Sequence, residues 1–136
     1  MARAALIPEL HLKARNEPGL LGRIVIALSL EGVDILHLSA YSNENGEGHL
    51  QLVTKDPAKA RKCLAHFIPE VDEREALVVE FENKVGTLAP VARLLGSHGI
   101  FIHYVYGTSG DGFKITGVFS TSDNRKAAEL INAQPV

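Results

Sequence analysis

Asn16-Glu17-Pro18-Gly19-Leu20-Leu21 recurs 67 residues later as Asn83-Lys84-Val85-Gly86-Thr87-Leu88, and this recurrence organises the whole chain. The same offset relates further pairs without a gap: Leu28 and Leu95, Gly32 and Gly99, Ile35 and Ile102, Thr54 and Thr121, Asp56 and Asp123, Lys59 and Lys126. An ungapped repeat at a fixed period indicates two copies of one supersecondary unit. The matched positions are mostly turn glycines and apolar residues, where a fold has its strictest requirements.

Each copy predicts a strand, a helix, a two-stranded hairpin and a second helix. The opening strand of copy one alternates, with Leu10, Leu12 and Ala14 on one face. The first helix of each copy has apolar residues at i, i+3, i+4 and i+7, which are Leu21, Ile24, Val25 and Leu28 in copy one and Leu88, Val91, Ala92 and Leu95 in copy two. The order βαββα(β) predicts an α+β fold of two tandem ferredoxin-like modules.

Glycine, proline and aspartate residues predict where these elements begin and end. Gly32 and Gly99 should cap the C-termini of the first helices. The hairpin strands are expected at residues 33–42 and 50–54 in copy one, and at 100–108 and 113–120 in copy two, with Asp111-Gly112 in the second turn. Asp56 and Asp123 should precede the second helices.

The segment 71–82 joins the copies and leaves almost no linker. Residues 71–74 can close copy one, and the alternating residues from Leu77 can open copy two. We therefore expect one module over residues 8–75 and a second over 76–136. The offset places the last strand of copy two beyond residue 136, so the second module should lack it. The apolar stretch Ala4–Ile7 is an alternative cover for the vacant edge.

Composition limits the classes of function. The chain has 136 residues, 46% of them hydrophobic, and 14 Lys+Arg against 16 Asp+Glu give a net charge of −2. This balance argues against disorder and against a nucleic-acid binder held by phosphate contacts. No apolar run approaches the ~20 residues of a membrane helix. Pro8 and Glu9 interrupt the N-terminal apolar stretch too early for a signal peptide, so a cytoplasmic location is expected.

Neither a metal nor a cofactor is expected. The single cysteine, Cys63, excludes an internal disulfide and a multi-cysteine metal site. The six histidines form no H-x-x-x-H pair. Cys63 lies on the apolar face of the predicted second helix, which favours an inert core position over a nucleophile.

The repeated motifs resemble the N-x-P-G-x-L … G-[VI]-N-I signature of ACT domains. Asn16–Leu21 and Glu31–Ile35 carry the resemblance in copy one, and Asn83–Leu88 and His98–Ile102 carry a more divergent one in copy two. Residues 9–132 together are similar to standalone tandem-ACT proteins of bacteria. The resemblance implies a regulatory protein without catalytic activity that binds a small ligand, most often an amino acid, at the loops between first strand and first helix and where modules meet.

Twelve residues are thereby candidate ligand contacts: Asn16, Glu17, Pro18, Gly19, Leu20, Leu21, Asp34, Ile35, Asn83, Gly86, Thr87 and Leu88. Unpaired N–H groups at a helix N-terminus suit a carboxylate. A glycine at the loop removes the Cβ that would hold a ligand away. An asparagine amide can donate to a carboxylate and accept from an ammonium group, and Asp34 can pair with an ammonium group.

Copy two departs from the motif. Phe101 stands where the family has Asn or Asp, and Val85 stands where it has proline. This loop has therefore either lost its polar contacts or lines an apolar pocket. A structural interpretation also stands beside the functional one: Asn16 can cap the following helix, and Asp34 can be an ordinary turn residue.

Other functional classes are less favoured. An acylphosphatase-like enzyme needs a cationic anion loop, and Arg15 and Asn16 are in place, but Glu17 adds a negative charge. No nucleophile and base can be assembled. An RNA-recognition module needs exposed aromatics in a basic surface, which are absent from the pattern. The remaining alternative is a scaffold, or a trans-acting regulatory subunit of a metabolic enzyme, without its own ligand. Exposed sheet edges predict a homodimer or larger assembly.

Overall fold

The computed structural model describes residues 2–109 and 112–135. In order, its elements are β1 (Arg3–Arg15), α1 (Leu20–Leu30), β2 (Ile35–Ser42), β3 (Glu47–Thr54), α2 (Pro57–Leu64), β4 (Glu70–Glu82), α3 (Leu88–Ser97), β5 (Ile102–Thr108), β6 (Lys114–Thr121) and α4 (Asn124–Asn132). The predicted α+β fold and its element order are confirmed. The predicted hairpin dipeptide at 111–112 includes residue 111, which lies outside the described residues.

The chain divides into two compact units. The first module comprises Pro8–Arg74, and the second comprises the residues up to Ile7 together with those from Glu75 onward. Strand β1 therefore supplies its first residues to the second module and the rest to the first. Strand β4 does the reverse, because its residues 70–74 belong to the first module. The junction segment thus closes one module and opens the next.

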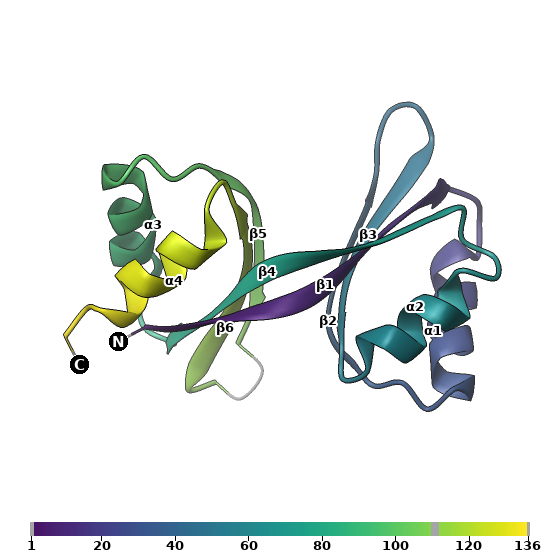
Figure 1. Cartoon of the computed structure of the whole chain (residues 1–136), viewed down its shortest axis with the longest axis horizontal. Coiled ribbons are helices and arrows are strands. Elements are labelled where there is room, and N and C mark those ends of the chain that lie inside the picture. The colour runs from purple at the N-terminus through teal and green to yellow at the C-terminus, as the bar shows by residue number, and fades with distance from the viewer. Residues whose placement is uncertain (1, 110–111, 136) are drawn as a thin grey trace. The chain divides into compact units, whose positions relative to one another are not determined.

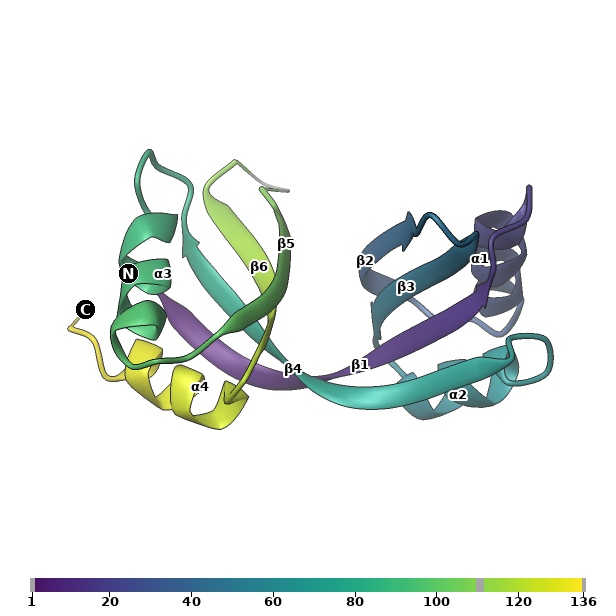
Figure 2. The same cartoon turned by 90° about the horizontal axis from the view of Figure 1, so that it is seen from above.

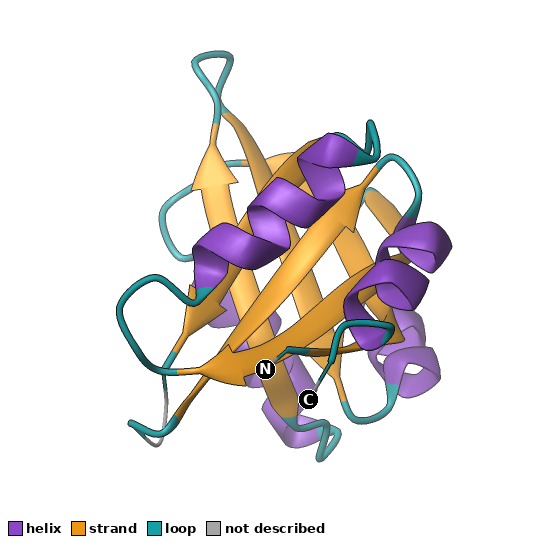
Figure 3. Ribbon diagram, turned by 90° about the vertical axis from the view of Figure 1, so that its left-hand side faces the viewer, coloured by secondary structure: helices purple, strands orange, loops and turns teal. Residues whose placement is uncertain are grey.

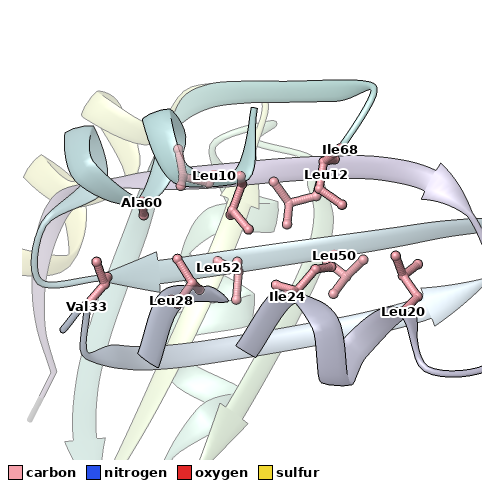
Figure 4. Close-up of a cluster of buried hydrophobic side chains, with 11 residues drawn as sticks. Leu10, Leu12, Leu20, Ile24, Leu28, Val33, Leu50, Leu52, Ala60 and Ile68 are labelled. Carbon is pink, nitrogen blue, oxygen red and sulfur yellow. The ribbon is translucent and has the colours of Figure 1, made fainter. Parts of the chain in front are cut away.

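In the first module, β1 and β2 both pair with β3 in antiparallel register, and Leu52 lies opposite Leu10 on one side and Leu38 on the other. Helices α1 and α2 lie on one face of this sheet (Figure 2). Leucine and isoleucine side chains from α1 point toward those of β1 and β3 (Figure 4). The alternating apolar residues of β1 therefore form part of the core that α1 covers.

The second module has the corresponding arrangement. β4 and β5 both pair with β6, with Phe119 opposite Leu77 and Val105. Helices α3 and α4 lie on one face of that sheet (Figures 1 and 3). Its core consists of Leu77, Val79, Phe81, Val91, Leu95, Ile100, Phe119, Ala127 and Ile131.

The N-terminal strand occupies the position predicted to be vacant in the second module. No strand follows α4 among the residues described to 135, as expected. β1, however, neighbours β4 in the sheet, and its residues 3–7 belong to this module. Ala4 and Leu6 pack against the core. The Asn132 side chain donates to the Ala4 carbonyl at 2.8 Å and accepts from the Ala4 N–H at 2.8 Å. The missing strand is therefore supplied from the other end of the chain.

Helix boundaries follow the predicted capping residues. Gly32 and Gly99 have φ of 69° each, and the N–H of Val33 donates to the Leu28 carbonyl, as at a glycine C-cap. The Asp56 carboxylate accepts from the N–H of Lys59 at 3.1 Å, and the Asp123 carboxylate makes the matching bond at 3.1 Å. Equal sequence at the repeat offset produces equal local structure.

The predicted apolar stripe of α1 needs one correction. Leu20 is buried with Ile24 and Leu28, whereas Leu21 is 44% exposed. The buried positions are thus i, i+4 and i+8, because Leu20 follows Gly19 directly and faces β3. Leu88, the counterpart of Leu21, is also exposed.

Among the described residues, no helix has the length and apolar character needed to cross a bilayer.

Candidate functional site

The β1–α1 loop of the first module ends in a left-handed glycine. Gly19 has φ of 88°, and a Cβ there would meet no atom within 4 Å, so the Cβ direction points into open space. The first N–H of the helix, that of Leu20, donates to the Glu17 carbonyl at 3.1 Å. No side chain caps α1. The start of this helix is therefore open to an external acceptor.

Asn16 lies at the entry to this loop. Its backbone N–H donates to the Gly46 carbonyl at 2.9 Å, which ties the loop to the β2–β3 turn. The structure does not bear out the capping interpretation, because the N-cap of α1 is Gly19 and carries no side-chain bond. The Asn16 side chain makes no hydrogen bond within the described part of the chain. Its amide is thus available to a ligand.

A small cavity of about 200 Å³ lies beside Asn16. It is lined by Asn16, Leu20, Leu21, Ala40, Tyr41, Ser42, Gly48 and Leu50. Gly48 permits the close approach of α1 to β3, because a Cβ there would lie 3.2 Å from Leu20 Cδ2. The cavity combines an apolar wall of leucines with one unbonded amide, which suits a small ligand with an apolar part.

A second cavity of about 490 Å³ shares Asn16 and is polar. Lys13 Nζ lies 3.0 Å from a carboxylate oxygen of Glu47 and 3.8 Å from one of Glu70. The hydrogen bond that Lys13 donates to the Glu47 carboxylate raises the pKa of Lys13. The hydrogen bonds that Glu47 accepts from Asn43 and Lys13 lower the pKa of Glu47. Two carboxylates thus balance Lys13 and the adjacent Arg15, so this cavity offers little attraction to a phosphate.

Asp34 is not brought together with Asn16. Asp34 follows the C-terminus of α1, whereas Asn16 precedes its N-terminus, and 11 helical residues span about 16 Å. The Asp34 carboxylate lies 3.5 Å from Lys55 Nζ, and its carbonyl accepts from the Lys55 N–H at 3.0 Å. Ile35 packs against the core. One ligand at the β1–α1 loop cannot contact Asp34 within the same module.

In the second module, the polar groups of the equivalent loop are used internally. Asn83 Nδ2 donates to the Gly112 carbonyl at 3.0 Å, and Thr87 Oγ1 donates to the Glu82 carbonyl at 2.7 Å. Gly86 repeats the left-handed φ at 85°. Gly86 and Thr87 line a larger cavity, and Leu88 is 46% exposed. The left-handed glycine is thus repeated in the second module, but the Asn83 amide is hydrogen-bonded, unlike the Asn16 amide in the first.

Sequence reasoning missed the far wall of the small cavity. Ala40, Tyr41, Ser42 and Gly48 come from the hairpin β2–β3 and carry no motif. The Tyr41 ring stacks on that of His49 with centroids 5.1 Å apart. The glycine-rich turn after Tyr41 was the only signal, and it indicated only a hairpin.

The helix-free face of the first module carries a second unpredicted feature. Glu9 is fully buried, and its carboxylate lies 2.7 Å from Nε2 of His11. Burial lowers the pKa of His37 below its ordinary value of 6.5, and the charge of Glu9 opposes this effect. Glu9 and His11 alternate along β1 with the core residues Leu10 and Leu12, so they lie on the opposite face of the sheet.

The lowered pKa of His37 predicts a pH effect on stability. The unfolded chain takes up a proton at higher pH than the folded chain, so the free energy of unfolding should fall as pH drops from about 7.5 to about 5.5. His37→Gln should make the melting temperature less dependent on pH over this range. The exposed His66 provides the control variant His66→Gln. An equal pH dependence in wild type and His37→Gln would contradict the prediction.

Comparison with known proteins shows the fold. No protein-family model matches the sequence, and no curated protein sequence does. A crystal structure of a Bacteroides thetaiotaomicron protein matches with a TM-score of 0.86 at 25% identity, covering 95% of this chain and 88% of that one. The ligand-free regulatory subunit of aspartate kinase from Thermus thermophilus matches with a TM-score of 0.71 at 18% identity, covering 95% and 94%.

A longer enzyme contains the same fold as one part. Aspartate kinase from Synechocystis matches with a TM-score of 0.69 at 17% identity, over 96% of this chain and 26% of that one. Both the separate subunit and the longer enzyme therefore share the architecture of this chain.

Proposed function

We propose that this protein is a regulatory protein of the tandem-ACT type, and that it binds a free amino acid at the β1–α1 loop of its first module. The observation that carries the proposal is the small cavity in which the unbonded Asn16 amide lies beside the uncapped start of α1. Its fold is shared over 95% of the chain with a protein described as the regulatory subunit of aspartate kinase. The repeated ACT-like motifs agree with this assignment.

A zwitterion suits the polar part of this cavity. The helix N-terminus and Asn16 Nδ2 can donate to an α-carboxylate, and Asn16 Oδ1 can accept from an ammonium group. Leu20, Leu21 and Leu50 form the wall that an apolar side chain would contact. Asp34 is assigned no contact at this loop, because α1 separates the two.

The chain is proposed to regulate a partner and to catalyse no reaction itself. Burial raises the pKa of the Cys63 thiol, whose Sγ lies 3.6 Å from the Ala27 carbonyl, so its thiolate is disfavoured. Regulation would then act in trans, for example on a metabolic enzyme. The alternative is a scaffold without a ligand, which exposed Leu36 and Leu38 on the edge strand β2 favour.

Association of two chains is proposed through the strand edges that remain. The edge beside β4 cannot serve, because residues 3–7 cover it. Strand β2 and strand β5 are the edges of the sheet, and Ile102 and Val105 repeat the exposed apolar character of Leu36 and Leu38. We expect sedimentation at micromolar concentration to show a dimer or larger species. A monomer alone would overturn this proposal.

A thermal-shift screen of the standard amino acids tests ligand binding. With an affinity on the order of micromolar, ligand at about a hundred times its Kd should stabilise the fold by ~2.7 kcal/mol. A shift of several degrees follows for a chain of this size. Gly19→Val should abolish the shift, because the added side chain would extend into the open space at the helix start. Asn16→Ala should weaken binding by about 1–3 kcal/mol.

Gly86→Val provides the matched control. Gly86 has nearly the same φ as Gly19, 85° against 88°, and neither Cβ would meet an atom within 4 Å. Both variants therefore carry similar backbone strain, but only Gly19→Val should lose the ligand shift. If no amino acid raises the melting temperature of the native protein, the scaffold alternative is preferred.

A further inference from the structure

A large cavity lies in the second module and has no role in the proposed function. Its volume is about 690 Å³. Pro90 and Leu94 of α3, Ile131 of α4 and Phe81 of β4 form much of its apolar wall. Adding 67 to each residue of the small cavity gives its counterpart in the second module. Of these counterparts, only Thr87 lines the cavity described here. It therefore lies on a different side of the first helix of its module.

The first module fills the corresponding place with its own side chain. The repeat offset relates Gln134, which lines the cavity, to Phe67. Phe67 packs against the core of the first module, and the Arg23 guanidinium lies 5.2 Å from the centre of its ring. Gln134 is exposed and gives the second module no such ring. The cavity thus exists where one copy has an aromatic side chain and the other lacks it.

The rim of the cavity carries a cation, Arg93, that has no counter-ion among the described residues. Lys84 is held by Glu82, whose carboxylate lies 2.8 Å from its Nζ. Arg93 also lines the cavity, and within residues 2–109 and 112–135 its guanidinium makes no ion pair or hydrogen bond. A guanidinium beside an apolar wall is complementary to a carboxylate that carries an apolar group.

We propose that this cavity binds a small-molecule carboxylate with an apolar body. The apolar body takes the place that the Phe67 ring occupies in the first module, and the carboxylate pairs with Arg93. The site is separate from the amino-acid site proposed above, and a ligand here needs no ammonium group. The volume is within the range of pockets that hold small organic ligands.

Isothermal titration calorimetry of the whole chain with 3-phenylpropanoate and octanoate tests this site. Each should bind, and the uncharged 3-phenylpropanol and 1-octanol should bind at least about tenfold more weakly, because they lose the charged contact with Arg93. Arg93→Gln should weaken carboxylate binding about tenfold and leave alcohol binding unchanged. Arg61→Gln, at a helix position outside the cavity, is the charge-matched control and should bind as wild type.

Gln134→Phe should remove binding of both carboxylates, because the new aromatic ring would fill the cavity as Phe67 fills the corresponding place in the first module. The first module shows that a phenylalanine is accommodated at this position of the repeat, and the melting temperature checks that the variant is folded. Carboxylate binding that survives Gln134→Phe, equal binding of acid and alcohol, or no binding to the native protein at millimolar concentration would each overturn the proposal. Gly19→Val should retain carboxylate binding, so this proposal and the amino-acid proposal fail independently.

Discussion

Replacing residues 3–7 with alternating glycine and serine is expected to unfold the second module and leave the first module folded. These residues form the strand beside β4, and Ala4 and Leu6 pack against the core of the second module. Glycine and serine keep the backbone hydrogen-bonding groups, but the replacement removes the partly buried Leu6 side chain and adds flexible glycines that disfavour a strand, which together cost about 5 kcal/mol. That loss is comparable with the whole stability of a small domain.

Amide hydrogen exchange separates the two modules in this experiment. Protection of β6 should be lost in the variant, whereas protection of β3 should persist. Asn132→Ala is the milder companion, since it removes only the two bonds to Ala4, and should cost about 1–3 kcal/mol without unfolding the module. Unchanged protection of β6 after the replacement would show that the N-terminal strand is dispensable.

Phe119→Ala is expected to destabilise the second module by about 3–5 kcal/mol. Phe119 is 1% exposed, at the centre of β6 between β4 and β5. Its ring lies over Gly117, where an added Cβ would be 3.0 Å from Phe119 Cε1. Truncation therefore leaves a cavity in a close-packed core that has few ways to collapse.

Urea denaturation of the two variants Phe119→Ala and Phe101→Ala measures this cost against a matched control. Phe101 is 74% exposed, so its truncation should change the free energy of unfolding by less than about 0.5 kcal/mol. A loss below about 1 kcal/mol for Phe119→Ala would contradict the close packing described for this core.

The sequence singled out three of the eight residues that line the small cavity, namely Asn16, Leu20 and Leu21. The repeat predicted two left-handed glycines at the starts of the first helices, and Gly19 and Gly86 have that conformation. Asn16 lies between β1 and α1, and its contact with a ligand stays a prediction. Asp34 lies beyond the opposite end of α1, and proximity in a motif does not show that a helix separates two residues. The hairpin residues that complete the cavity carried no pattern that points to a ligand.

The sequence by itself determined the elements, their order and the two-copy organisation, because these depend on interactions between residues a few positions apart. Periodicity, glycine conformation and aspartate capping act within one or two turns of chain, so they recur wherever the residues recur. Only the tertiary structure decided which segment completes the second module and which grooves remain open. The Ala4–Asn132 bonds join residues 128 positions apart, and the cavity depends on Gln134 in place of a packed Phe67. Such long-range contacts depend on which surfaces, distant in sequence, can bury each other, and a local sequence pattern does not predict them.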